Sequence, residues 1–332
     1  MILLKADVKY IPQEYSIIGM YKQIELAGRT CYKSNNKITV NSYKTFIERL
    51  KANQHYAMLE FGTIYLHKVL ENAYDEGYCI FDKYNKNPYS KAKILDNKLY
   101  VTTNYRVLVE NGWEEDLEYF QCTDVHDKRY MFRIITDRGV SHELVRHRVF
   151  SFAQESTRFC NYNSDKFNNE LSFIIPSTSS LTSDSTKADN LNKLSDTDRI
   201  LLYSFSNAEE NYKQLISEYN CTPQQARAVL PNSLKTEICM TGFLDDWLHF
   251  LALRLHGKTG KPHPDMLVIA KKIDLLLKNN VAVFNMKRFY FKMTVNGNTI
   301  DVNCMAKTKQ EAELLFVKAY QDIDKLEFIK FE

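Results

Sequence analysis

The chain contains a strand pattern that ends abruptly and is followed at once by a helix pattern. The segment YMFRIIT, residues Tyr130–Thr136, has the composition of a β-strand. An Asp-Arg-Gly tripeptide ends this strand, and Val140–Val145 begins a helix. A second unit of this kind follows, in which Leu234–Met240 alternates as a strand and Asp245–Leu255 has helical spacing. The chain therefore combines predicted strands and helices, and we expect a fold of the α+β class.

Further elements are predicted on both sides of these units. Helical spacing also covers residues 201–219, and the Thr-Pro-Gln-Gln segment from Thr222 has the capping residues of a helix start. Ser177–Thr186 is rich in Ser and Thr and predicts a solvated, mobile loop. The other predicted elements are a helix at Ser42–Ala52 with Ser42 as its N-cap, a strand at Gly62–His67, a hairpin around Leu95–Val109 with its turn at Asp96-Asn97, and a helix at Asp265–Leu277.

The sequence changes character from about Phe284 onward. Arg288–Val295 and Thr299–Met305 flank an Asn-Gly-Asn turn, which predicts a hairpin. Lys309–Ile323 is then predicted as a helix and Leu326–Phe331 as a final strand. We therefore expect a catalytic domain at residues 1–283, with residues 68–128 as an elaboration outside its central core, and an appended ββαβ module at residues 284–332.

Composition excludes several classes of protein. Lys and Arg number 44 against 41 for Asp and Glu, so charge alone predicts no nucleic-acid partner. No apolar run is long enough for a membrane span, and the N-terminus lacks the pattern of a signal peptide, so we expect a cytoplasmic protein without a membrane partner. The seven cysteines form no CxxC pair, which argues against a zinc ribbon or a thioredoxin-type site and fits reduced thiols.

The segment RHRVFSFAQESTRF, residues Arg146–Phe159, concentrates the candidate functional side chains of the sequence. It carries three arginines and a histidine within thirteen residues, interleaved with hydroxyls and an amide. Guanidinium groups bind phosphate bidentately, and Arg146 and Arg148 point the same way if the segment is extended. Judged from charge alone, a phosphate site is as open as its alternative, which is either a solvated basic face or a set of structural ion pairs.

A metal site at this segment fails on geometry. His142 and His147 resemble the pair of a zinc protease motif, but they are five residues apart rather than four. On a helix this spacing leaves the two rings roughly 140° apart, so they cannot share one metal ion. We expect no metal.

The segment RHRVFSFAQESTR resembles the signature of the flavin-dependent thymidylate synthases. Four further segments resemble that family in the same order: AGRTCY at Ala27–Tyr32, His55 before Leu59-Glu60, ARAVLP at Ala226–Pro231 and HFLALR at His249–Arg254. The resemblance covers roughly residues 15–280, interrupted at 68–128. It implies the family's fold, a mixed sheet with flanking helices, and a homotetramer in which FAD sits between subunits.

The resemblance also implies ligands for individual residues. The implied FAD contacts are His55, Arg146, His147, Arg148, Gln154 and His249. The implied dUMP contacts are Glu143, Arg146, Gln154, Glu155, Ser156, Thr157, Arg158, Arg227 and Arg254. Arg254 is the implied catalytic residue, placed against the pyrimidine, where a fixed cation offsets negative charge in the ring.

The implied reaction transfers a one-carbon unit from methylenetetrahydrofolate to dUMP. Reduced flavin supplies the hydride, NADPH reduces the flavin again, and the products are dTMP and tetrahydrofolate. No cysteine is placed as a nucleophile, and Ser156 has no adjacent base in the sequence, so we interpret Ser156 as a nucleotide ligand.

Several positions depart from the family's pattern. Phe61 replaces a histidine, Ala57 a threonine near the flavin and Ala153 an asparagine. The other departures are Glu143, Gln154, Phe243 and His249. The resemblance therefore supports the dUMP contacts more fully than the FAD contacts.

Two other functions remain open from the sequence. A non-catalytic nucleotide- or RNA-binding protein would use the arginines with the 21 tyrosines and 19 phenylalanines for phosphate contact and stacking. An FAD-binding tetramer with impaired turnover would follow from the substitutions around the flavin.

Overall fold

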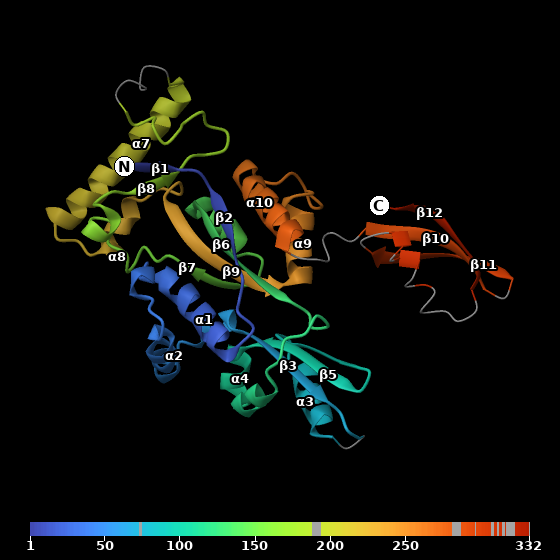
Figure 1. Ribbon diagram of the computed structural model, residues 1–332. Helices are drawn as coiled ribbons and strands as arrows, with labels where there is room; N and C mark the ends of the chain where they lie inside the picture. Colours follow the sequence, from blue (N-terminus) through green and yellow to red (C-terminus); the bar gives the residue numbers. More distant parts are fainter. Residues whose placement is uncertain are drawn as a thin grey trace. The chain divides into compact units, whose positions relative to one another are not determined.

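The computed structural model describes residues 1–72, 75–187, 194–280, 287–295, 297–306, 309–310, 312–313, 316 and 323–331 (Figure 1). The chain forms two compact units, Met1–Lys271 and Lys272–Glu332. The predicted boundary after residue 283 stays a prediction. No helix in the described ranges is long and apolar enough to cross a membrane.

A four-stranded antiparallel sheet lies at the centre of the first unit. Its order is β2-β6-β9-β7, formed by Asp7–Ile11, Arg129–Asp137, Lys235–Phe243 and Ser151–Gln154. Phe132 pairs with Met240 across β6 and β9, and Met131 pairs with Thr241. Since side chains alternate along a strand, these two pairs lie on opposite faces of the sheet. The predicted strands at 130–136 and 234–240 are confirmed.

Helices cover both faces of this sheet. On one face, α1 (Ile17–Cys31) packs its buried Met20, Ile24 and Ala27 into the same hydrophobic cluster as Met131. On the other face, Trp247 of α9 (Leu244–Arg254) meets the ring of Phe132 edge-on at 4.8 Å. The two-sided cover explains why the interior of β9 is buried along both faces. The expected α+β fold is confirmed.

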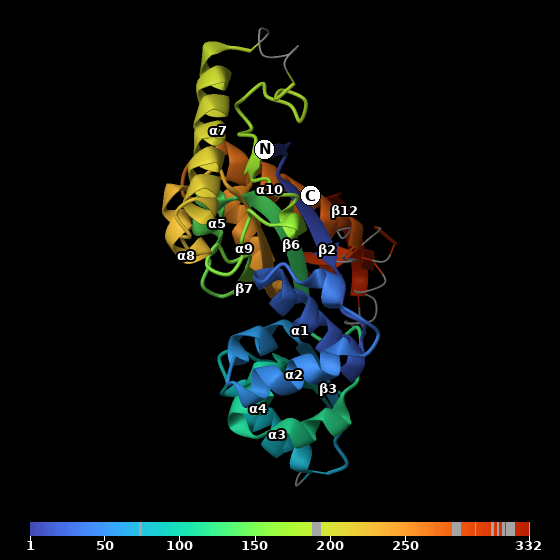
Figure 2. The ribbon, with the colours of Figure 1, turned by 90° about the vertical axis from the view of Figure 1, so that its left-hand side faces the viewer.

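Helix α2 (Ser42–Ala52) lies beside α1, as both ribbon views show (Figure 2). Its predicted bounds are confirmed, but the predicted N-cap is wrong. Asn41 occupies the N-cap, and Ser42 is the first helical residue. The Ser42 hydroxyl is engaged elsewhere, since it accepts from the Thr39 amide and donates to Glu25 Oε2 at 2.9 Å.

A second sheet, of order β3-β5-β4, is formed by Thr63–Val69, Lys98–Asn104 and Lys91–Leu95. The turn at Asp96-Asn97 is confirmed, with both φ angles positive at 50° and 54°. The hairpin ends earlier than predicted, however. The Asn104 side chain accepts from the Val107 amide and starts α4 (Tyr105–Asn111), so residues 105–109 are helical.

The segment 68–128 contributes to the main hydrophobic cluster of the first unit. Ile80 of α3 (Glu76–Asn85), Leu99 and Leu108 belong to the same cluster as Met20 and Ile24 of α1. The segment therefore shares its core with the central sheet.

The first unit also contains the following elements: β1 (Ile2–Leu4), β8 (Ser172–Ile174), α5 (Arg138–Leu144), α7 (Asp196–Ser217), α8 (Pro223–Ala226) and the 3-10 helices η1 (Asn35–Lys37), η2 (Tyr56–Phe61), η3 (Glu114–Tyr119), η4 (Asp165–Phe167) and η5 (Arg227–Val229).

A third region of the first unit gathers around α7. Phe205 of α7 stacks on Phe173 of β8 at 4.8 Å. The capping box predicted at Thr222 is present. Ser177–Thr186 is irregular as predicted but not fully solvated, because Leu181 and Ser185 are buried.

Helix α10 (Pro264–Asn280) spans the boundary between the two units and confirms the predicted helix there. The second unit carries an antiparallel sheet of order β11-β10-β12, formed by Asn298–Ala306, Lys287–Val295 and Ile323–Phe331. Phe291 and Met293 of β10 pack on Ala312. The predicted hairpin and final strand are confirmed. Of the predicted helix at 309–323, residues 309, 310, 312, 313 and 316 are helical, residue 323 begins β12, and the rest lie outside the described residues.

Candidate functional site

The Arg-His-Arg segment lies in the turns between α5 and β7. The Asp137 side chain accepts from the Val140 amide at 2.8 Å and so starts α5 directly after β6. The helix ends at Leu144, and regular extension resumes only at Ser151. Arg146 and Arg148 are therefore presented from turns rather than from an extended strand. His147 between them is buried, whereas both arginines are exposed.

The exposed arginines carry charge that one chain does not neutralise. Within the described ranges, Arg146, Arg148 and Arg227 have no side-chain hydrogen bond or ion pair. Arg148 lines a pocket of about 580 Å³, whose walls include Phe150 and Phe243. Of the alternatives that the sequence left open, structural ion pairs are not formed by these three side chains within the described residues, while their exposure fits a phosphate site and a solvated basic face alike.

Arg254, at the C-terminal end of α9, is held at two points. Its Nε donates to His147 Nε2 at 3.0 Å, and its Nη1 donates to Glu143 Oε2 at 3.3 Å. Glu143 comes from α5, so three separate elements meet at this group. Arg254 and Glu143 also line an open pocket of about 540 Å³, together with residues Thr259–Pro264.

His147 is a neutral partner for Arg254. Burial, the positive charge of Arg254 and the nearby His249 lower the pKa of His147 to about 4. Because Nε2 accepts from Arg254, the single ring proton is assigned to Nδ1. His147 also packs edge-on against Phe250 at 5.0 Å. The guanidinium of Arg254 is thus fixed in place without a second positive charge beside it.

The last residue of β7, Gln154, and the next residue, Glu155, make mostly internal contacts. Gln154 Nε2 donates to Ser141 Oγ at 2.8 Å and to Thr236 Oγ1 at 3.1 Å. Glu155 is 1% exposed, and its carboxylate accepts from the Tyr162 hydroxyl at 2.9 Å. The structure therefore places Gln154 and Glu155 as supports beneath the loop that begins at Ser156.

Residues 156–158 lie next to the end of α1 and next to α8. The Ser156 amide donates to the Cys31 carbonyl at 3.0 Å, and Ser156 Oγ accepts from the Arg158 amide at 3.2 Å. Arg158 is exposed, and its Nε donates to Oε1 of Gln224, which lies three residues before Arg227. Thr157, between Ser156 and Arg158, is buried. The fold thus brings Arg158 to the α8–η5 segment that carries Arg227.

Sequence reasoning missed a buried charge network beneath this loop. Lys235 Nζ donates to Glu155 Oε2 at 2.8 Å and to Glu237 Oε1 at 3.0 Å. Lys33 and Arg133 also pair with Glu237. Burial alone would raise the pKa of Glu237, but Lys235 and Lys33 lower it to about 2. The one local sign of this charge network in the sequence is the Lys-Thr-Glu spacing, which places Lys235 and Glu237 on one face of β9.

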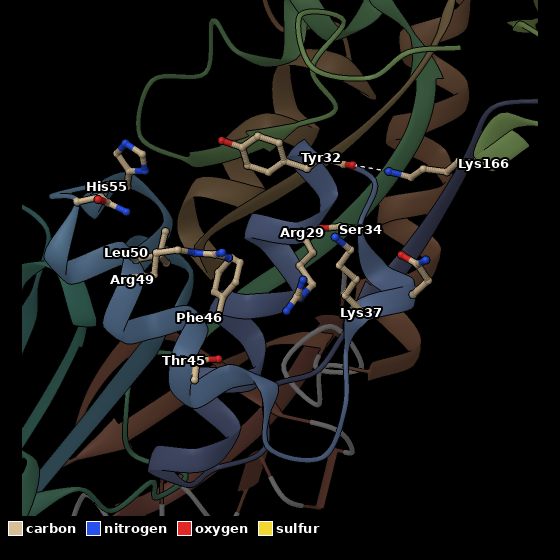
Figure 3. A pocket seen from close by; sticks show the side chains of 12 residues that line it. Arg29, Tyr32, Ser34, Lys37, Thr45, Phe46, Arg49, Leu50, His55 and Lys166 are labelled. Carbon is tan, nitrogen blue, oxygen red and sulfur yellow. Dashed lines mark hydrogen bonds between the residues drawn. The ribbon is translucent and has the colours of Figure 1, made fainter. Parts of the chain in front are cut away.

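His55 lies in a different part of the unit. It is exposed and lines two pockets of about 860 and 520 Å³, which also share Tyr32, Phe46 and Leu50 (Figure 3). His249 is exposed on α9, near His147. The predicted residues of one chain therefore line several pockets rather than one.

The substituted positions fall in both surface and core. Ala57 lines the smaller His55 pocket, and Phe243 lines the Arg148 pocket. Phe61 and Ala153 are buried in the main hydrophobic cluster. In the described part of the chain, no group of His, Cys, Asp and Glu side chains is arranged to hold a metal ion.

Comparison with known proteins identifies relatives of the chain. Residues 127–280 match the family model described as thymidylate synthase complementing protein. Over 207 residues the chain is 30% identical to a flavin-dependent thymidylate synthase of Corynebacterium efficiens, and this match covers 60% of the chain and 70% of the relative. A second relative with the same name, from Corynebacterium glutamicum, is 29% identical over 211 residues, covering 62% and 72%.

Likeness to solved structures is weaker. The UMP/dUMP methylase PolB from Streptomyces cacaoi aligns with a TM-score of 0.40 and 16% identity, covering 84% of this chain and 93% of that one. The family assignment rests on the sequence relatives, because the match to the C. efficiens enzyme extends over most of that relative's length. The chain belongs to the flavin-dependent thymidylate synthase family.

Proposed function

We propose that this chain converts dUMP to dTMP, using methylenetetrahydrofolate as the one-carbon donor and NADPH as the final reductant. One dUMP, one methylenetetrahydrofolate, one NADPH and one proton give dTMP, tetrahydrofolate and NADP⁺. The observation that carries the proposal is the fixed guanidinium of Arg254, supported by exposed arginines that have no side-chain partner among the described residues. Such a set suits a ligand that combines a phosphate with a ring that becomes negatively charged.

We assign the nucleotide to the residues around Arg254 and the loop from Ser156. Arg254 lies against the pyrimidine and favours loss of the N3 proton, which increases electron density at C5. Arg158 and Arg227 bind the phosphate, with Ser156 and Thr157 as neutral donors. Glu143, Gln154 and Glu155 act mainly through the residues that they hold, because each is already bonded within the chain. His147 remains neutral and leaves the charge of Arg254 undiminished.

The donor set also fits FAD. Arg146 and Arg148 are exposed and unpaired within the described residues, as a diphosphate would require. Arg148 opens onto a pocket with aromatic walls. We assign FAD to Arg146, His147, Arg148, His55 and His249, with Gln154 acting through the contacts that it already holds. When bound, FAD supplies the hydride chemistry, while the protein binds, orients and shields the reactants.

The distribution of these residues supports a shared site. In one chain they line separate pockets, and a complete site would combine residues from neighbouring subunits of a homotetramer. No disulfide joins cysteines in the described part of the chain, which supports a working place in the reducing cytoplasm.

The proposal is tested by spectrum and turnover together. The purified protein is incubated with FAD, passed through a desalting column and examined for flavin absorbance. dTMP is then measured with dUMP, methylenetetrahydrofolate and NADPH, and with each of them omitted. We expect retained flavin and dTMP only in the complete mixture. A protein that retains no flavin, or retains flavin without forming dTMP, would contradict the proposal in favour of the binding or impaired alternatives.

A further inference from the structure

The larger of the two pockets at His55 has a basic character that the proposed chemistry at dUMP does not explain. We call it the basic pocket; it has a volume of about 860 Å³, within the range of small-molecule sites. Its cations are Arg29, Lys37, Arg49 and Lys166, and no described residue that lines it is Asp or Glu (Figure 3). A pocket of this charge fits a polyanionic ligand.

Three of the four cations are not neutralised within the described chain. Arg29 is paired with Glu25 at 2.6 Å and therefore adds little net charge. Lys37 is exposed and has no protein partner in the described ranges. Among the described residues, the Arg49 guanidinium has a cation–π contact with Phe46 and no ion pair. Lys166 donates to the Tyr32 carbonyl at 2.7 Å, which leaves its charge uncompensated.

The neighbouring pocket lacks this uncompensated positive charge. It shares Tyr32, Phe46, Leu50 and His55 with the basic pocket, so the two are adjoining spaces. Its one cation, Arg106, is paired with Glu60 at 2.7 Å and with Glu110 at 2.8 Å. The pair of pockets therefore suits one ligand with an uncharged ring system at one end and several negative charges at the other.

Among the reactants of the proposed function, the folate has this form. Its pteridine ring carries the one-carbon unit, and its glutamyl tail carries the carboxylates, one more for each added γ-glutamyl residue. NADPH and FAD differ, because the diphosphate of each lies between two ring systems. We propose that the basic pocket binds the glutamyl tail of the folate donor and that Lys37, Arg49 and Lys166 make the enzyme prefer polyglutamylated folates. This inference rests on the proposed function.

Direct binding tests the subsite without turnover. The FAD-loaded protein with dUMP is titrated calorimetrically with pteroylmonoglutamate and with pteroyltriglutamate at low salt. Exposed ion pairs change affinity by about two- to fivefold each, so we expect the triglutamate to bind roughly tenfold more tightly. The ratio of triglutamate to monoglutamate affinity should fall toward one in two variants. These are the double variant that combines Lys37→Gln with Lys166→Gln, and the single variant Arg49→Gln. High salt should reduce this ratio in the same way in the wild type.

Controls separate this inference from its alternatives. Lys44 lies on α2, the helix that also carries Arg49, but it does not line the basic pocket. Lys44→Gln should therefore leave the affinity ratio of the two folates unchanged. Equal binding of the two folates by the wild type would overturn the proposal, as would a double variant that loses NADPH affinity instead.

Turnover measured in parallel separates the two proposals. If dTMP forms with the monoglutamate donor but the affinity ratio is one, the subsite is overturned and the proposed function stands. If no dTMP forms but the ratio is present and is lost in the variants, the subsite stands and the proposed function is overturned.

Discussion

Arg254 Nε donates a hydrogen bond of 3.0 Å to Nε2 of His147, so a permanently charged side chain is anchored on a neutral imidazole. The pair joins the end of α9 to the turn after α5, two segments that are more than 100 residues apart in the sequence. Since His147 is buried and Arg254 cannot lose its proton, protonation of the imidazole would place two positive charges in contact. The geometry therefore links the protonation of His147 to both stability and the position of Arg254.

Stability should fall as the pH drops from about 6.5 to 4. Burial and Arg254 lower the pKa of His147 to about 4, whereas the unfolded chain takes up this proton near its ordinary value of 6.5. Between these values the unfolded state binds more protons, so the free energy of unfolding decreases by an amount on the order of 3 kcal/mol. Below pH 4 this contribution no longer changes. Urea unfolding at several pH values measures the slope.

The variant His147→Gln isolates this contribution. Glutamine retains an acceptor for Arg254 but does not titrate. The slope of the free energy of unfolding against pH, between pH 6.5 and 4, should therefore be smaller by the contribution of one proton. The matched control is His256→Gln, at an exposed position, which should keep the wild-type slope. An unchanged slope in His147→Gln would show that other groups cause the acid sensitivity.

Arg254 should be essential for turnover but not for flavin retention. Arg254→Ala removes the cation that we propose to lie beside the pyrimidine, and kcat should fall by about 100-fold or more. Arg254→Lys retains a charge but cannot donate to His147 and Glu143 with one planar group, so it should also be severely impaired. Flavin absorbance and dTMP formation are measured on the same samples. Wild-type turnover in either variant would remove Arg254 from its proposed role.

Local chemistry explains which parts of the fold the sequence predicted well. The strand-to-helix junction at Asp137, the turn at Asp96-Asn97 and the capping box at Thr222 depend on residues only a few positions apart. Each was predicted because the capping or turn-forming side chain acts within its own segment. The same reasoning failed at Asn104, where the side chain that ends β5 caps the next helix.

Long-range contacts explain what the sequence did not predict. The Lys235–Glu155 pair joins residues 80 positions apart, and Lys166 reaches the carbonyl of Tyr32 across 134 positions. Neither has a local signature, because charge patterns do not encode which strands become neighbours. The resemblance to the family supplied the candidate residues. It did not indicate that Glu155 is buried or that Arg254 is held by a neutral His147.

Arg158 should contribute to dUMP binding rather than to flavin binding. Its Nε is positioned by Gln224, and its guanidinium lies 5.1 Å from the ring centre of Phe159. Arg158→Ala should raise the KM for dUMP by about tenfold, as expected for loss of a charge-assisted contact, with flavin absorbance retained. Gln224→Leu removes only the positioning bond, so it should raise the KM for dUMP by a smaller factor, about two- to threefold. Loss of flavin with dUMP affinity intact would reverse the proposed division between the two ligands.

Lys235 should stabilise the loop from Ser156 through its buried partners. Its side chain is 11% exposed, and it pairs with Glu155 and Glu237, which are almost fully buried. Lys235→Met keeps the apolar stem but leaves Glu155 without a cation, so the free energy of unfolding should decrease by about 3–5 kcal/mol. In the Lys235→Met background, Glu155→Gln should restore part of this loss because it removes the uncompensated charge. The matched control Lys213→Met breaks a pair with Glu209 that is more open to solvent, and it should cost less than about 1 kcal/mol. Urea unfolding compares the variants, and the KM for dUMP reports on the loop. Equal stability of Lys235→Met and the wild type would show that Tyr162 alone is enough to hold the buried Glu155 carboxylate.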